Sequence, residues 1–116
     1  MDSQNVIDSS VFTALKETMG ADFVVELVQT YAEETPQLLA SLQEALAKQD
    51  CETFNRAAHS IKSASNSMGA LKLGEMAKEL EIMGREKNLA GAASKVEALV
   101  SVFAQVKLTL EELTHA

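Results

Sequence analysis

RAAHSIKSASNSMGALKLGEMAKELEIMGR, residues 56–85, contains two amphipathic helical patterns that meet at Met68 and Gly69. An α-helix turns by about 100° per residue, so side chains three and four positions apart share a face. One face of the first pattern carries mostly apolar and small side chains: Phe54, Ala57, Ala58, Ile61, Ala64, Ser65 and Met68. His59 lies roughly opposite this face. We therefore expect His59 to be exposed to solvent.

The second pattern repeats large apolar residues at intervals of three and four: Leu73, Met76, Leu80 and Met83. A flanking stripe runs beside them and contains Gly74, Ala77, Lys78, Glu81 and Arg85. If the chain reverses near Gly69, residues whose numbers add up to about 140 lie side by side in a helical hairpin. His59 is then the neighbour of Glu81, and Ser63 is the neighbour of Ala77.

An exposed histidine beside a carboxylate suits nucleophilic chemistry. A carboxylate that accepts the Nδ1 proton fixes the tautomer and leaves the lone pair of Nε2 pointing outward. Lys62 and Arg85 add positive charge, which can hold the oxygens of an incoming phosphoryl group. The small side chains of Ser63 and Ala77 leave the surface flat enough for a large partner to approach.

The same residues carry a resemblance to a known family. The sequence has His59-x-x-Lys62, then Gly69-Ala70, then Leu73 and Leu80-Glu81. This order resembles the signature of the histidine-containing phosphotransfer (HPt) domain of bacterial phosphorelays. The resemblance implies a helical bundle whose exposed histidine takes a phosphoryl group from a receiver-domain aspartate and passes it to another receiver domain.

The resemblance also implies roles for individual residues. It assigns His59 as the phosphoacceptor, Lys62 as the cation beside the phosphate and Glu81 as the hydrogen-bond partner of the imidazole. Arg85 matches a position that is often basic in the family. Ser63 departs from the family pattern, because glycine usually follows the lysine.

A partner protein is expected to cover the surface around the histidine. We assign this footprint to Arg56, Ser63, Asn66, Gly69, Ala77 and Lys78. The partners that the resemblance implies are receiver domains of response regulators, a hybrid sensor histidine kinase, or both. Mg²⁺ is expected on the receiver domain, and this chain is expected to have no cofactor or metal of its own.

The composition favours a single all-α domain over residues 1–116. Apolar residues make up 47% of the 116 residues but aromatic residues only 4%, with one proline and five glycines. Helices are expected over 9–19, 21–47 and 92–113, in addition to the two hairpin helices, which end near Met68 and Lys87. These patterns predict an antiparallel up-and-down four-helix bundle with a short additional N-terminal helix.

Proline and capping residues refine these expectations. Pro36 interrupts the helical pattern of residues 21–47, which then resumes in phase, so we expect one bent helix. Two helices that meet at Thr35 are the alternative. Asp8 and Asp50 are expected N-caps.

The core of the second helix is expected to contain Phe23 or Val24, then Leu27, Val28, Tyr31, Leu38, Leu42 and Leu46. The last helix shows a nearly perfect heptad of Ala92, Val96, Leu99, Phe103, Val106, Leu110 and Leu113.

Charge and cysteine content limit the possible partners and location. The net charge is −7, but residues 56–87 carry +2 and the remainder −9. Most of this surface would repel nucleic acid, whereas a local basic face suits the acidic active site of a receiver domain. The single cysteine, the lack of a membrane-spanning run and the start MDSQNVID indicate a cytoplasmic protein. We expect a monomer. The chain is either freestanding or a part of a larger hybrid kinase, and Met1 with a helix near each end fits the freestanding alternative.

Two functional hypotheses remain distinct at this point. The chain has no glycine-rich ATP loop, so the first hypothesis is a phosphocarrier without ATP-dependent kinase activity of its own. The second is a non-catalytic helical adaptor that binds a receiver or kinase without taking phosphate. Binding that persists in His59→Ala, with no phosphohistidine ever formed, would favour the adaptor.

Overall fold

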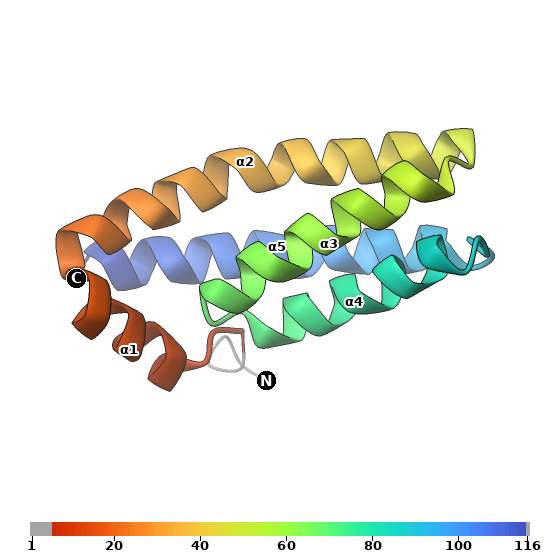
Figure 1. Cartoon of the computed structure of the whole chain (residues 1–116). Helices are drawn as coiled ribbons and strands as arrows, with labels where there is room; N and C mark the ends of the chain where they lie inside the picture. Colours follow the sequence, from red (N-terminus) through yellow and green to blue (C-terminus); the bar gives the residue numbers. More distant parts are fainter. Residues whose placement is uncertain (1–5, 116) are drawn as a thin grey trace.

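The computed structural model describes the backbone of residues 6–115 and the side chains of residues 6–114, and within this part of the chain it contains five α-helices and no strand. The helices are α1 (Ser9–Met19), α2 (Ala21–Lys48), α3 (Cys51–Ser67), α4 (Leu71–Arg85) and α5 (Ala92–His115). The prediction of an all-α protein is confirmed. Figure 1 shows that α2 to α5 run side by side in alternating directions, while α1 lies at the end where α2 begins.

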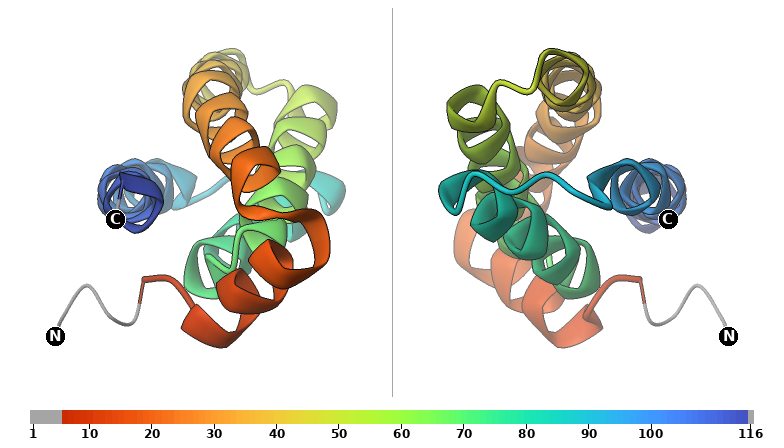
Figure 2. Two further views of the ribbon diagram at one scale, coloured as in Figure 1. Left: turned by 90° about the vertical axis from the view of Figure 1, so that its left-hand side faces the viewer. Right: turned by 90° about the vertical axis from the view of Figure 1, so that its right-hand side faces the viewer.

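Each of the four long helices packs against two of the others. Helix α3 contacts α2 and α4, and α5 contacts the same two helices. Figure 2 shows the consequence end-on, with α3 and α5 on opposite sides of the arrangement. One face of α3 is therefore turned away from the core. None of the helices in residues 6–115 combines the length and apolar character needed to cross a bilayer.

The helix ends follow the capping residues. Oδ1 of Asp8 accepts hydrogen bonds from the backbone N–H groups of Ser10 and Val11, and Oδ1 of Asp50 accepts one from Thr53. Both predicted N-caps are confirmed, since these bonds satisfy donors that lack a partner within the helix. The fourth helix ends at Arg85, slightly earlier than predicted.

Pro36 lies inside one continuous helix. Helix α2 passes through Pro36 without a break, so the prediction of one helix is confirmed and the alternative of two helices meeting at Thr35 is wrong. Pro36 itself is exposed, whereas Thr35 is buried. The backbone donor that proline lacks is therefore lost on the solvent side, where water can bind the unpaired carbonyl.

The core contains the expected stripes, with changes at their edges. In α2, Val24 is buried and Phe23 is 43% exposed, which decides between the two residues. Leu39 is buried, whereas Leu27, Leu38 and Leu46, which are predicted for the core, are only partly buried and pack against its edge. Leu113 in α5 is 38% exposed, so its assignment to the core is wrong. The heptad stays buried through the preceding apolar positions and becomes exposed near the end of the helix.

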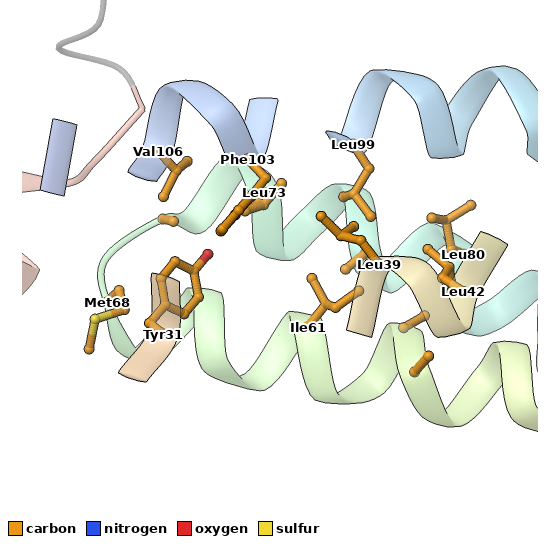
Figure 3. Close-up of a cluster of buried hydrophobic side chains, with 14 of the residues drawn as sticks. Tyr31, Leu39, Leu42, Ile61, Met68, Leu73, Leu80, Leu99, Phe103 and Val106 are labelled. Carbon is orange, nitrogen blue, oxygen red and sulfur yellow. The ribbon is translucent and has the colours of Figure 1, made fainter. Parts of the chain in front are cut away.

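Large apolar side chains from all four long helices meet in the centre of the molecule. Figure 3 shows this cluster, which includes Leu42, Ile61, Leu73, Leu80 and Leu99. At one end, the ring of Tyr31 packs edge-on against Phe103, with the ring centroids 5.6 Å apart. The hydroxyl groups of Tyr31 and Ser65 are hydrogen bonded at 2.8 Å, so both polar groups are satisfied inside the core.

Candidate functional site

Small residues let α4 approach α3 closely. A Cβ atom added at Gly84 would lie 2.8 Å from the backbone N of Asn55 and 2.9 Å from the carbonyl O of Cys51. At Gly74 an added Cβ would collide with the side chain of Asn66. Ala77, between the two glycines, is fully buried. The backbones of the two helices are therefore near enough for short side chains to bridge them.

Glu81 is the long side chain in this row of small residues. Its carboxylate reaches two residues of α3: Oε2 lies 2.8 Å from Nδ1 of His59, and Oε1 lies 2.8 Å from Nζ of Lys62. Its side chain is only 14% exposed, because α3 covers it. The predicted pairing of His59 with Glu81, and the hairpin register on which it depends, are confirmed.

His59 stands in the middle of α3 and faces solvent. Its side chain is 57% exposed, as predicted for a residue opposite the buried stripe. Because the carboxylate of Glu81 accepts a hydrogen bond from Nδ1, the neutral ring carries its proton there. Nε2 is left with a free lone pair, which is the form of the ring that can attack an electrophile.

The surroundings of Glu81 keep its carboxylate charged. The hydrogen bond from Lys62 is the largest cause that lowers the pKa of Glu81, and the hydrogen bond from His59 lowers it further. Partial burial acts in the opposite direction but does not cancel these effects. Glu81 is therefore ionised at neutral pH and can stabilise a positive charge on the imidazole.

Lys62 lies in the site, where it forms an ion pair with Glu81. It is predicted as the cation beside the phosphate, and in the structure its ammonium group is paired with Glu81 and its side chain is 25% exposed. Arg85 is exposed at the end of α4, one turn beyond Glu81, where it lines a shallow hollow with Asn55 and Gly84. Within residues 6–114, Arg85 forms no ion pair at 4.0 Å or less.

Four of the six predicted footprint residues lie on the surface. Ser63, Asn66 and Lys78 are exposed. Arg56 is exposed too, and its guanidinium group is paired with Glu52 of the same helix at 3.2 Å. These residues are accessible to a partner protein.

Gly69 and Ala77 are buried, so their assignment to direct partner contact is wrong. Gly69 has a positive φ of 85°, its carbonyl accepts a hydrogen bond from the N–H of Asp8, and Val11 of α1 packs over it. Ala77 is covered by the close approach of α3. For Ala77 the sequence signal for burial was its position between Gly74 and Gly84, two small residues that also approach α3 closely.

The sequence prediction did not include Asn55. Its side-chain Nδ2 donates a hydrogen bond of 2.6 Å to the backbone carbonyl of Glu81. The spacing contained a signal, because Asn55, His59, Lys62 and Asn66 follow one another at intervals of four, three and four residues along the α4-facing side of α3. Among residues 6–114, no group of three or more His, Cys, Asp or Glu side chains is placed to hold a metal ion.

Comparisons with known proteins agree with this geometry. The family model of the Hpt domain matches residues 26–116, which include the whole α3–α4 hairpin. The crystal structure of histidine-containing phosphotransfer protein B (HptB) from Pseudomonas aeruginosa PAO1 is similar, with a TM-score of 0.89 and 31% sequence identity over 95% of each chain. A search of curated proteins found no significant match. The chain therefore belongs to the Hpt domain family and serves as a histidine phosphotransfer protein of a phosphorelay.

Proposed function

We propose that His59 is the residue that carries the phosphoryl group. The observation that supports this assignment is the 2.8 Å hydrogen bond between Nδ1 of the exposed His59 ring and the carboxylate of Glu81. The sequence contains one other histidine, His115, at the end of α5. His59 lies on the face of α3 that is turned away from the core, where a receiver domain can reach it.

The proposed reaction starts from an aspartyl phosphate on a receiver domain. The lone pair of Nε2 attacks the phosphorus in line, the N–P bond forms, and the P–O bond to the aspartate breaks. The electron pair of that bond stays with the aspartate carboxylate. The proton stays on Nδ1, so the ring becomes positively charged and the carboxylate of Glu81 stabilises it. Attack by an aspartate of another receiver on the phosphohistidine reverses these steps.

The cations around the ring have a supporting role in this proposal. Lys62 neutralises Glu81 before transfer. Because Lys62 and His59 contact the same carboxylate, the lysine can turn toward the oxygens of a phosphoryl group bound to the ring. Arg85 adds positive charge one turn away along α4. Mg²⁺ is expected on the receiver domain, so this chain acts as a phosphocarrier with no cofactor and no ATP-dependent kinase activity of its own.

The partners follow from the same chemistry. We propose that they are receiver domains of response regulators, or a hybrid sensor histidine kinase, because the net charge of +2 over residues 56–87 complements the acidic site of a receiver. The exposed side chains of Arg56, Ser63, Asn66 and Lys78 form the proposed footprint. Nucleic acid and membranes are not expected ligands, given the net charge of −7.

The fold and cellular setting can be proposed in more detail. The alternating directions of α2 to α5 in Figure 1, and the packing of each on two others, support an antiparallel up-and-down four-helix bundle with α1 as a short additional helix. We propose that the protein is a monomer in the cytoplasm. The single cysteine and the nature of the partners support this location.

The assignment of His59 can be tested directly with a radiolabelled, phosphorylated receiver domain. Label should move to this protein, be lost in acid, and disappear in His59→Gln. The matched control is His115→Gln, which removes the other histidine and should take label normally. Label that survives His59→Gln would refute the assignment. Binding of receivers without any label would instead support the adaptor hypothesis.

A further inference from the structure

We infer that Asn55 is a positioning residue for phosphotransfer, because its amide ties the backbone of Glu81 to α3 and so holds the carboxylate of Glu81 at His59. This inference rests on the proposed role of His59. It concerns a residue that touches neither the phosphoryl group nor the ring, and that acts through Glu81.

The contact joins two helices at the level of the site. Nδ2 of Asn55 donates to the carbonyl O of Glu81 over 2.6 Å, between residues 26 positions apart, in a partly buried setting. A carbonyl oxygen has two lone pairs, so a helical carbonyl can accept a second donor. The bond also fixes the orientation of the asparagine, whose amide would otherwise turn freely toward water.

Gly84 makes this contact possible. An added Cβ at Gly84 would lie 2.8 Å from the backbone N and 2.9 Å from the Cβ of Asn55. Any larger residue there would push the two helices apart at the level where the short side chain of Asn55 must reach across. The hydrogen bond from Asn55 to Glu81 therefore depends on the glycine at position 84.

Glu81 is thus held at two points by the same helix. Its main chain is bonded to Asn55, and its carboxylate is bonded to His59, one turn further along α3. A slide of α4 by a single residue would move Glu81 by about 1.5 Å, enough to break a hydrogen bond of ordinary length. The bond from Asn55 opposes this slide close to the reactive ring.

A purely structural role would give different results. If Asn55 only held the hairpin together, its removal would lower the stability of the fold but would not change the tautomer of His59. If Asn55 positions Glu81, its removal weakens the hydrogen bond at Nδ1, and the ring then populates the tautomer with its proton on Nε2. That tautomer has no lone pair on Nε2 with which to attack phosphorus.

The test uses two variants of the full chain. Asn55→Leu keeps the branched shape and removes the donor, and Asn55→Ala removes the amide without adding bulk near Gly84. The ¹⁵N resonances of the His59 ring report the tautomer, and the transfer of label from a phosphorylated receiver reports the rate. The control is Asn88→Ala, which removes an asparagine whose side chain accepts a hydrogen bond from the N–H of Ala90 in the α4–α5 loop.

Both Asn55 variants should shift the ring toward the Nε2-protonated tautomer and slow transfer by about fivefold, the factor expected for one neutral hydrogen bond. The control should match the wild type in both measurements. In a Glu81→Ala background, Asn55→Leu should cause no further loss of rate, because the residue through which it acts is gone.

Wild-type tautomer and rate in a folded Asn55 variant would overturn the inference, as would the same fivefold loss in the Glu81→Ala background. These outcomes differ from a failure of the proposed function, in which the wild type itself takes no label at His59.

Discussion

Nζ of Lys62 lies 2.8 Å from Oε1 of Glu81, so this lysine, one turn along α3 from the proposed phosphoacceptor His59, is already paired with a carboxylate. The second oxygen of the same carboxylate holds the histidine ring. The carboxylate of Glu81 thus links His59 to Lys62. A phosphoryl group on Nε2 would compete with Glu81 for the lysine, and Glu81 would then be left to the positively charged imidazole.

Replacement of Lys62 by methionine should slow transfer to His59 by about tenfold, because it removes the hydrogen bond that the lysine can donate to the phosphoryl oxygens. A hydrogen bond to a charged group contributes roughly 1.5–3 kcal/mol, and this one is partly screened by water. The measurement is the time course of labelling from a phosphorylated receiver.

Lys95→Met is the matched control for this experiment. It removes the same charge from a lysine that pairs with Glu79 at 3.3 Å between α4 and α5. Equal rates for the two methionine variants would show that Lys62 acts only through net charge.

Glu81→Gln should change how stability depends on pH. The pKa of Glu81 is lowered from 4.5, mainly by its hydrogen bond to Lys62, so the folded state favours the charged form. The stabilisation is fully present above pH 4.5 and is lost as the pH falls through the lower, folded-state pKa. The difference in Tm between the wild type and Glu81→Gln should therefore be larger at neutral pH than in acid. A difference that stays constant across this range would contradict the prediction.

Tyr31 offers a second titration. Burial raises its pKa to about 12, against the smaller opposing effect of its hydrogen bond to Ser65. It is the only tyrosine and the chain has no tryptophan, so an ultraviolet absorbance titration reports this group alone. Absorbance should rise near pH 12 in the folded protein, whereas the denatured chain should titrate near pH 10.

The raised pKa also predicts a loss of stability in alkali. The folded state favours the neutral hydroxyl, so the stabilisation is present below pH 10 and is lost as the pH rises toward 12. Each pH unit of this interval corresponds to about 1.4 kcal/mol, so the free energy of unfolding should fall by roughly 2–3 kcal/mol in total. Urea denaturation at a series of alkaline pH values measures this loss, and Tyr31→Phe should show a smaller one.

The two glycines of α4 should respond differently to alanine. At Gly84 an added Cβ meets the backbone of α3, which cannot move aside, so Gly84→Ala should destabilise the fold by about 1–3 kcal/mol. At Gly74 it meets only the side chain of Asn66, which can rotate away. Gly74→Ala should be about neutral, because alanine gains up to about 1 kcal/mol of helix propensity over glycine. Equal denaturation midpoints for the two variants would mean that α3 and α4 are not closely packed at Gly84.

Periodicity and hairpin register were sufficient to predict much of the site. The exposure of His59 followed from its position opposite the apolar stripe, and its pairing with Glu81 followed from a reversal at Gly69. Both depend only on helix geometry. The N-caps Asp8 and Asp50 were equally local, because a cap bonds N–H groups two or three residues away.

The errors arose where contacts depend on the distance between helices. The flanking stripe predicts an exposed Ala77, but the close approach of α3 buries this residue, and Gly69, at the turn between α3 and α4, is covered by α1. Leu38 gave way to Leu39 because the buried stripe of α2 continues through Thr35, a polar residue that the apolar pattern does not count. The spacing of polar residues along α3 places Asn55 on the side that faces α4, but it does not identify the partner of Asn55, because that partner is a main-chain carbonyl.

The central position of His59 in α3 has a consequence for how partner proteins bind. The helix extends eight residues to either side of His59, from Cys51 to Ser67, so the proposed phosphoacceptor lies on a continuous helix and not on a loop that could carry the phosphoryl group from one partner to another. The receiver domain that gives the phosphoryl group and the one that takes it must therefore bind the same surface around His59, one after the other. While one receiver is bound, a second cannot bind, so an excess of unphosphorylated receiver should act as a competitive inhibitor of phosphoryl transfer.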